Sequence, residues 1–366
     1  MRDLRIPLLA AVFLLAASAP MPAAARPPAA TGPRGDLRVV VFGDFHGPYG
    51  AVTYPAAVAR TVAAIVDDWR PDLVLLPGDL IAGQSRSLPD ERFAEMWAAF
   101  DAAVAAPLRR AGIPYAATMG NHDASKLRDT GGAYAFARER DAAAAYWSAP
   151  HHRDGLAVVD GAAYPFAWSL RLGPLFVAVI DASGPWLDDA ELAALEATLG
   201  NPAARDAMLR WVMGHLPPVG IAEGRDRPGE VLARTDRLLE VLAAGRVDTF
   251  VAGHQAVAYA GVWQGLELMY AGGVGARRIL GGGPPRSAVA VVDVDLAEGR
   301  VRVRFFDPAS LEPLPDDAFP ARVDGFGGTL LRSERLRPRT RGGRTSWRGR
   351  HTVQASGSHV PLARAT

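Results

Sequence analysis

Cysteine is absent from the 366-residue sequence, and this absence excludes several kinds of structure. No disulfide can stabilise the fold, and no lipid can be attached to a cysteine behind an N-terminal leader. Structural zinc sites built on thiolates are excluded for the same reason. The protein must therefore rely on its core, and on any bound metal, for its stability.

Lysine is nearly absent as well, because Lys126 is the only lysine among the 40 basic residues. The formal net charge is only +1, so the chain as a whole carries no strong charge that would attract nucleic acid or an anionic membrane. The distribution is uneven, since nine arginines and one glutamate lie from position 331 onward. We interpret the arginine content as a compositional bias rather than as phosphate recognition, and no clear nucleic-acid partner is indicated.

Long apolar runs are missing except near the N-terminus. There, Arg2 and Arg5 precede an apolar stretch of fourteen residues, 6–19, which is shorter than the roughly 20 residues that span a bilayer. Small residues follow, and Ala23-Ala24-Ala25 matches a signal-peptidase site. The pattern predicts a signal peptide over residues 1–25, cleaved after Ala25, and a secreted or periplasmic protein with no transmembrane segment after cleavage. A membrane anchor or a plain alanine-rich tail is the alternative.

The rest of the chain alternates strand and helix patterns at first and then runs mainly through strands. Residues 26–36 are rich in Pro, Ala and Gly and are expected to be a linker. The expected strands lie within residues 37–44, 72–79, 114–121, 167–173, 175–181, 208–215, 248–254, 266–272, 288–295 and 300–307. The expected helices lie within residues 55–69, 89–110, 124–146 and 187–199. This order predicts an α/β layered fold with two sheets in one domain, residues 37–310, followed by an Arg-rich tail, residues 311–366.

Five of the expected strands end in side chains that bind metals. The first ends in Asp44 and His46 and the second in Asp79; the third is followed by Asn121, His122 and Asp123, and two later strands end in His215 and His254. The crevice beyond the carboxyl ends of strands is where α/β proteins form their sites. An Asp after Gly, or a lone His, is by itself more often a turn or structural residue. The repetition at five strand ends is what predicts a site.

The histidines support this interpretation. Four of the eight lie at these strand ends, whereas His151 and His152 fall in a polar insert and His351 and His359 in the tail, where we expect them to be solvated. Asp, Asn and His side chains without thiolate suit Zn, Mn or Fe better than Ca.

The order of motifs D-x-H, GD, GNHD, GH and GH resembles that of the calcineurin-like metallophosphoesterases, over about residues 37–307. The stretch IDASGPWLDDAELAALEATL, residues 180–199, is similar to the family's segment between its GNH and third-histidine motifs. The resemblance implies a two-sheet β-sandwich flanked by helices, with two metal ions at the carboxyl ends of its strands. It also implies an enzyme that hydrolyses a phosphoester.

The resemblance assigns a role to each motif residue. Asp44 and His46 would bind the first metal, Asp79 would bridge both, and Asn121, His215 and His254 would complete the second. His122 would be a proton donor to the leaving oxygen instead of a ligand. Its neighbour Asp123 is a candidate for orienting it.

The chain departs from the family at Ala256. The family's last motif is Gly-His-x-His, and its second histidine binds the first metal, but this chain has Ala256 there. The first metal is then left with three protein ligands, so weaker binding is expected. Strand alternation would place residues 254 and 256 on one side of the chain. Candidates for supplying the missing ligand are Gln255 and, alternatively, His151 or His152.

Two further segments are less specific. The Gly-rich stretch 271–286 lacks a P-loop pattern and is expected to be a loop near the site, with Arg277 or Arg278 as a candidate phosphate contact. The Arg-rich tail is expected to be disordered, with an electrostatic arm for an anionic surface or nucleic acid as the alternative.

The sequence thus predicts a metal-dependent phosphatase or phosphodiesterase that acts on a small-molecule, lipid or nucleotide phosphoester. A degenerate, single-metal member that binds phosphorylated ligands without catalysis is the alternative. The sequence does not indicate the substrate or the oligomeric state.

Overall fold

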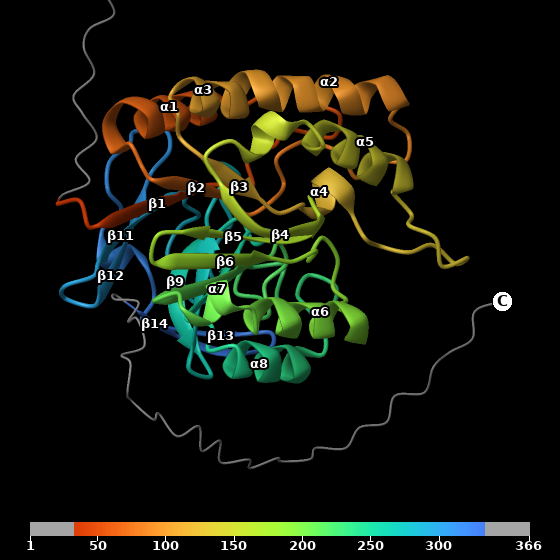
Figure 1. Ribbon diagram of the computed structural model, residues 1–366. Coiled ribbons are helices and arrows are strands. Elements are labelled where there is room, and N and C mark those ends of the chain that lie inside the picture. Colours follow the sequence, from red (N-terminus) through yellow and green to blue (C-terminus); the bar gives the residue numbers. More distant parts are fainter. Residues whose placement is uncertain (1–32, 334–366) are drawn as a thin grey trace, which may run out of the picture.

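Two β-sheets form the centre of the computed structural model, which describes residues 33–333 (Figure 1). Across the first sheet the strands are β12 (Arg300–Phe306), β11 (Val289–Asp295), β1 (Leu37–Val41), β2 (Leu73–Leu76) and β3 (Tyr115–Ala117). Across the second they are β13 (Arg322–Gly325), β14 (Gly328–Arg332), β9 (Ala258–Trp263), β10 (Leu266–Ala271), β8 (Thr249–Ala252), β7 (Leu209–Met213), β6 (Leu175–Val179), β5 (Ala167–Leu172) and β4 (Ala157–Ala163).

Helices cover the outer face of each sheet (Figure 1). The first sheet is covered by α1 (Ala56–Ala64), α2 (Asp90–Phe100), α3 (Ala106–Arg110) and α5 (Ala137–Trp147), and the short α4 (Asn121–Ala124) follows β3. The second sheet is covered by α6 (Asp189–Leu199), α7 (Pro202–Arg205) and α8 (Thr235–Ala244). The predicted α/β fold, a two-sheet sandwich flanked by helices, is confirmed.

The central strands bury both of their faces, which explains why their sequences are nearly continuous apolar runs. In β1, Val39 and Val41 contact the layer between the sheets, while Val40 faces the helices. In β7, Trp211 points between the sheets and Val212 points toward the second helical layer. The fold therefore has three apolar layers, and its polar chemistry is left to the ends of the strands.

The folded part extends past residue 310, the predicted end of the domain. β13 and β14 form a hairpin that adds to β9 at the edge of the second sheet. Residues 311–333 therefore belong to the folded part, which corrects the predicted boundary of the tail. The predicted signal peptide and residues 334–366, including His351 and His359, lie outside the described residues and stay predictions.

The described part of the chain has no helix that combines the length and the apolar character needed to cross a bilayer. Several elements carried no clear sequence pattern. The sequence does not predict helices α4, α7 and α8 or strands β4, β9, β13 and β14, whereas the other strands fall within the expected ranges.

A buried ion pair joins β1 to β11. Arg38 and Asp293 face each other in register, and Arg38 Nε donates to Asp293 Oδ1 at 2.8 Å and Nη2 to Oδ2 at 3.2 Å. Their side chains are only 5% and 3% exposed. Removing one member of such a pair leaves the other charge buried and uncompensated.

We therefore expect Asp293→Ala to lower the free energy of unfolding by about 3–5 kcal/mol, measured by urea denaturation. Asp324→Ala is the matched control, because it also removes a carboxylate paired with an arginine, Arg322, but on an exposed surface. The control should leave the unfolding midpoint nearly unchanged. An equally small change in both variants would contradict the buried-pair account.

Candidate active site

Five strand ends converge where the two sheets meet. β1, β2 and β3 are parallel, and so are β7 and β8, so the carboxyl ends of each set lie at one edge of their sheet. Hydrogen bonds join these edges, among them His215 Nδ1 to Pro77 O at 2.7 Å and His254 N to Asp44 Oδ1 at 2.8 Å. The structure thereby brings together the residues singled out from the sequence: Asp44, His46, Asp79, Asn121, His122, His215 and His254.

The glycines of the motifs permit this close approach. A Cβ at Gly120 would lie 2.2 Å from both the backbone nitrogen and Oδ1 of Asp79. A Cβ at Gly253 would lie 2.7 Å from Asp44 Oδ2. Any larger residue at either position would displace a carboxylate, so these glycines are required by packing at the site.

The residues that the family resemblance assigns to the second metal form a compact group. We call this group the second-site quartet: Asp79, Asn121, His215 and His254. His215 Nε2 lies 2.9 Å from Asn121 Oδ1 and 3.1 Å from Asp79 Oδ1. His254 Nδ1 lies 2.8 Å from the same amide oxygen. The ligand atoms of Asp79, His215 and His254 all lie within 4.8 Å of one another. The quartet therefore presents two oxygens and two nitrogens to one point.

The residues that the resemblance assigns to the first metal, Asp44, His46 and Asp79, are less closely spaced than the quartet. We call them the first-site group. His46 Nε2 lies 3.7 Å from Asp79 Oδ2, and the ligand atoms of His46, Asp79 and His122 lie within 4.8 Å of one another. Asp44 accepts the His254 amide through Oδ1, while its buried Oδ2 has no hydrogen-bond partner among residues 33–333. A buried carboxylate oxygen without a donor is a position that a cation satisfies.

Backbone carbonyls fix which nitrogen of each imidazole is free. Nδ1 lies 2.8 Å from Gly47 O in His46, 2.7 Å from Pro77 O in His215 and 3.1 Å from Gly83 O in His122. A carbonyl only accepts hydrogen bonds, so each Nδ1 carries a proton and each Nε2 is left for the site.

In His254 it is Nε2, and not Nδ1, that is held by a neighbouring oxygen. Its Nε2 lies 2.9 Å from Glu230 Oε2, which leaves Nδ1 to face Asn121. This is the carboxylate–histidine arrangement that orients metal ligands in proteins. The hydrogen bond from His254 also holds the pKa of Glu230 low, at about 2.

The electrostatics of the site favour a cation. Burial alone would raise the pKa of Asp79, but the charges of His215 and His122 outweigh burial and hold it well below its usual value. Burial would lower the pKa of His46 and of His215, but Asp79 raises both to about 9. Burial raises the pKa of Asp44 to about 7. The buried carboxylates that raise these two pKa values also attract metal cations, and the oxygen and nitrogen donors of the site fit divalent metal ions.

Three residues of the site had no sequence motif. Glu230 and Arg225 lie in the long connection between β7 and α8, and Arg225 Nη1 donates to His254 O at 2.6 Å. The same nitrogen lies 2.8 Å and 2.9 Å from the two ring nitrogens of His254. Gln84 is a third addition, because its Oε1 accepts a hydrogen bond from Asn121 Nδ2 at 2.7 Å. Only the folded chain reveals these neighbours.

Asp123 does not orient His122, which corrects one expectation. Its Oδ1 accepts the backbone N–H groups of Leu80 and Ile81 at 2.8 and 2.9 Å, and its Oδ2 accepts that of Gly120 at 2.7 Å. Asp123 thus fixes the turn that carries Asp79. The orientation of His122 comes from Gly83 O instead.

Gln255 does not fill the gap beside Ala256. Its Oε1 accepts the backbone N–H groups of Ile221 and Ala222, both at 3.0 Å, and its Nε2 donates to Glu230 O at 3.2 Å. This side chain anchors the loop that carries Arg225 and Glu230. The alternation argument also fails here, because β8 ends at Ala252 and residues 254 and 256 have positive φ values of 66° and 51°.

His151 and His152 lie away from the strand ends, and the expectation that both are solvated is wrong for one of them. His152 is buried, and its Nδ1 lies 2.9 Å from the hydroxyl of Tyr115. Its ring also packs against Trp147. His152 is therefore part of the core under α5, while His151 is exposed.

The strand ends open into a cavity of about 280 Å³. Its lining includes Asn121, His122 and His254 from the motifs, and Arg225 and Glu230 from the connecting loop. Arg278 pairs with Glu223 on the surface, and Arg277 is exposed and bonded through its backbone N–H to Ala256 O. Neither arginine lines this cavity, so a phosphate contact from either stays a prediction.

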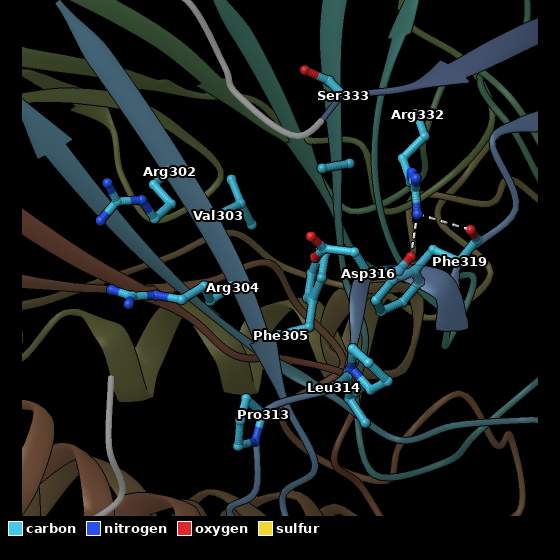
Figure 2. Close-up of a pocket in the computed structure, with 12 residues that line it drawn as sticks. Arg302, Val303, Arg304, Phe305, Pro313, Leu314, Asp316, Phe319, Arg332 and Ser333 are labelled. Carbon is cyan, nitrogen blue, oxygen red and sulfur yellow. Dashed lines mark hydrogen bonds between the residues drawn. The ribbon is translucent and has the colours of Figure 1, made fainter. Parts of the chain in front are cut away.

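A larger cavity, of about 450 Å³, lies elsewhere, between β12 and the segment that follows it (Figure 2). Its lining includes Arg302, Arg304 and Phe305, and Arg332 closes one side by donating to the carbonyls of Asp316 and Phe319. It contains none of the strand-end residues. The size of a cavity therefore does not by itself identify the candidate active site.

Solved structures share this fold at low sequence identity. The purple acid phosphatase PPD1 from seeds of yellow lupin (Lupinus luteus) is similar with a TM-score of 0.53 and 16% identity, over 76% of this chain and 52% of that one. A dimetal phosphatase from Danio rerio is similar with a TM-score of 0.50 and 14% identity, over 81% of this chain and 99% of that one. The chain spans about half the length of the lupin phosphatase. At these identities the likeness concerns the fold.

Comparison with curated proteins gave no significant match. A sequence model of one family, described as calcineurin-like phosphoesterase, does match, over residues 37–258. The matched range contains every strand-end residue described above and more than half of the chain. The protein therefore belongs to the calcineurin-like phosphoesterase family.

Proposed function

We propose that the protein hydrolyses a phosphomonoester or phosphodiester at the convergent strand ends, with His122 assisting the leaving group. The observation that carries the proposal is the second-site quartet, which is assembled beside a cavity that His122 also lines. The family supports metal-dependent phosphoester hydrolysis in general terms.

We propose two ions, of Mn, Zn or Fe, as the cofactors. Asp44, His46 and Asp79 would hold the first, and the second-site quartet would hold the other. Such ions lower the pKa of water and stabilise the charge of a phosphoryl group under attack. The first ion would have three protein ligands, because Ala256 offers no donor atom, and three protein ligands suffice for catalytic metals.

The residues themselves have separate tasks in this proposal. The carboxylate of Asp79 lies between the two groups, where its charge reduces the repulsion between neighbouring cations. His122 Nε2 is free for the cavity because Nδ1 is held by Gly83 O. Burial lowers the pKa of His122 to about 4, and a bound phosphoester, being anionic, would favour the protonated form of this imidazole. The proton on Nε2 then passes to the leaving oxygen.

A second candidate function rests on Ala256: a single-metal protein that binds phosphorylated ligands without hydrolysing them. The missing ligand weakens only the first site, whereas the second-site quartet is complete. Counting bound ions per chain separates the two functions. Two ions favour the enzyme, and one favours the binding protein.

The general test is hydrolysis of an aryl phosphate and of its methyl diester by metal-stripped protein to which Mn, Zn or Fe is added separately. We expect turnover that depends on the added metal and disappears on chelation. Well-folded, metal-loaded protein that turns over neither ester would overturn the proposed function.

The role of His122 is tested with His122→Asn. We expect metal content to stay near that of the parent while turnover falls by about 10²-fold or more, as for the loss of a general acid. Elemental analysis and steady-state kinetics measure the two effects. Asp79→Asn is the contrasting variant, because losing the shared charge should empty both sites. Loss of metal from His122→Asn would instead make His122 a ligand.

The effect of the missing ligand is tested with Ala256→His. We expect tighter metal binding at the first site, because an imidazole replaces water, and histidine tolerates the positive φ of this position. The gain should fade below pH about 6.5, where the new imidazole is protonated. Calorimetric titration of metal into stripped protein measures it. Unchanged affinity would show that position 256 does not reach the first metal.

A further inference from the structure

A rigid turn presents Tyr49 beside the candidate acid. The turn runs from Pro48 to Ala51, whose N–H donates to Pro48 O at 2.9 Å, and Gly50 supplies the positive φ of 75° that it needs. Gly50 N donates to Ala82 O at 2.7 Å, and Arg92 Nη1 donates to Gly50 O at 3.3 Å. The turn is therefore fixed to the body of the protein on two sides.

The ring of Tyr49 is exposed to solvent and is not buried in the core. The side chain is 64% exposed, although the turn that carries it is fixed. Its ring lies nearly parallel to that of His122, with the centroids 5.3 Å apart and the planes at 24°. The ring of His46 also stacks on His122, with the centroids 4.0 Å apart. Tyr49 thus extends an aromatic surface outward from His122.

The lining of the cavity includes both charged and uncharged side chains. Arg225 and Glu230 are charged and contact His254. Tyr49, Leu127 and Pro185 are uncharged, and Tyr49 contacts His122. Tyr49 is therefore in direct contact with the candidate acid, and Leu127 and Pro185 line the same cavity.

Leu127 belongs to a wall that is also held in place. The preceding residue, Lys126, donates to Asp181 O at 3.2 Å and pairs with Glu191. Gly184 packs closely against Lys126, since a Cβ at Gly184 would lie only 2.8 Å from Lys126 Cγ. Leu127 is 37% exposed and lines the cavity from this wall.

We propose that Tyr49, Leu127 and Pro185 form a leaving-group subsite that takes a planar, unsaturated ring carried close to the ester oxygen. The inference rests on the proposed function, in which His122 protonates the leaving oxygen. The exposed ring of Tyr49 would stack with such a flat ring, as aromatic pairs do. The cavity, of about 280 Å³, is near the lower limit of roughly 300–1,000 Å³ for small-molecule sites, which favours one ring system over a larger group.

The test compares benzyl phosphate with cyclohexylmethyl phosphate, because both release a primary alcohol and differ mainly in whether the ring is flat. For metal-loaded, full-length protein we expect kcat/KM to favour the benzyl ester roughly three- to tenfold. Tyr49→Phe should keep this ratio, and Tyr49→Ala should bring it close to one. The corresponding methyl diesters serve in the same way if the protein is a diesterase.

Met208→Ala is the control variant. Met208 is also a large, exposed apolar side chain, at 53%, but it precedes β7 and so lies at the end of the strand opposite to the site. Its loss should leave the ratio of the two esters unchanged. A ratio of one in the parent, or a ratio unaffected by Tyr49→Ala, overturns the subsite while hydrolysis itself upholds the proposed function.

Binding separates the two proposals if neither ester is hydrolysed. Benzylphosphonate and cyclohexylmethylphosphonate are then titrated into the metal-loaded protein in a calorimeter. A preference for the benzyl compound that Tyr49→Ala abolishes supports the subsite, although the proposed hydrolysis has failed. Equal affinities, or binding of neither compound, overturn the subsite as well.

Discussion

The negative charge of Asp79, buried between the ends of the two sheets, is the constraint on which the site depends. An isolated carboxylate in such a position is costly, and here it is balanced by the backbone N–H of His122 and by the imidazoles of His215 and His46. Each partner comes from a different strand end. The two sheets must therefore dock in one alignment for the charge to be satisfied, and that alignment also places the cavity.

The backbone at these strand ends is as unusual as the side chains. Asp44, Asp79, His254 and Ala256 all have positive φ values, between 48° and 66°. Residues other than glycine seldom adopt this conformation, and those that do cluster at functional sites. A residue in this conformation interrupts the extended, alternating backbone of a strand. The same conformation explains why strand alternation does not describe residues 254–256.

Much of the fold and the set of motif residues could be predicted because both are encoded locally. Apolar runs marked the central strands, and each polar side chain at a strand end came directly after its run. What could not be predicted depends on contacts between distant segments. Glu230 and Arg225 lie in a loop without a pattern, and hydrogen bonds to Gln255 and His254, from distant parts of the chain, hold that loop at the site. His152 appeared solvated because its neighbours in sequence are polar, yet the residues above it in the fold are Tyr115 and Trp147.

The hydrogen bond between His254 N and Asp44 Oδ1 spans 210 residues of sequence, which bears on the order of events during folding. Contacts of such long range form late, because closing a long loop costs chain entropy before any contact repays it. Asp44, which follows the first strand, can accept this hydrogen bond only after β8 and His254 have joined the fold. An unfinished chain therefore lacks the complete set of donors at this place. An ion bound in the proposed way would add a further link between the two sheets once both are folded.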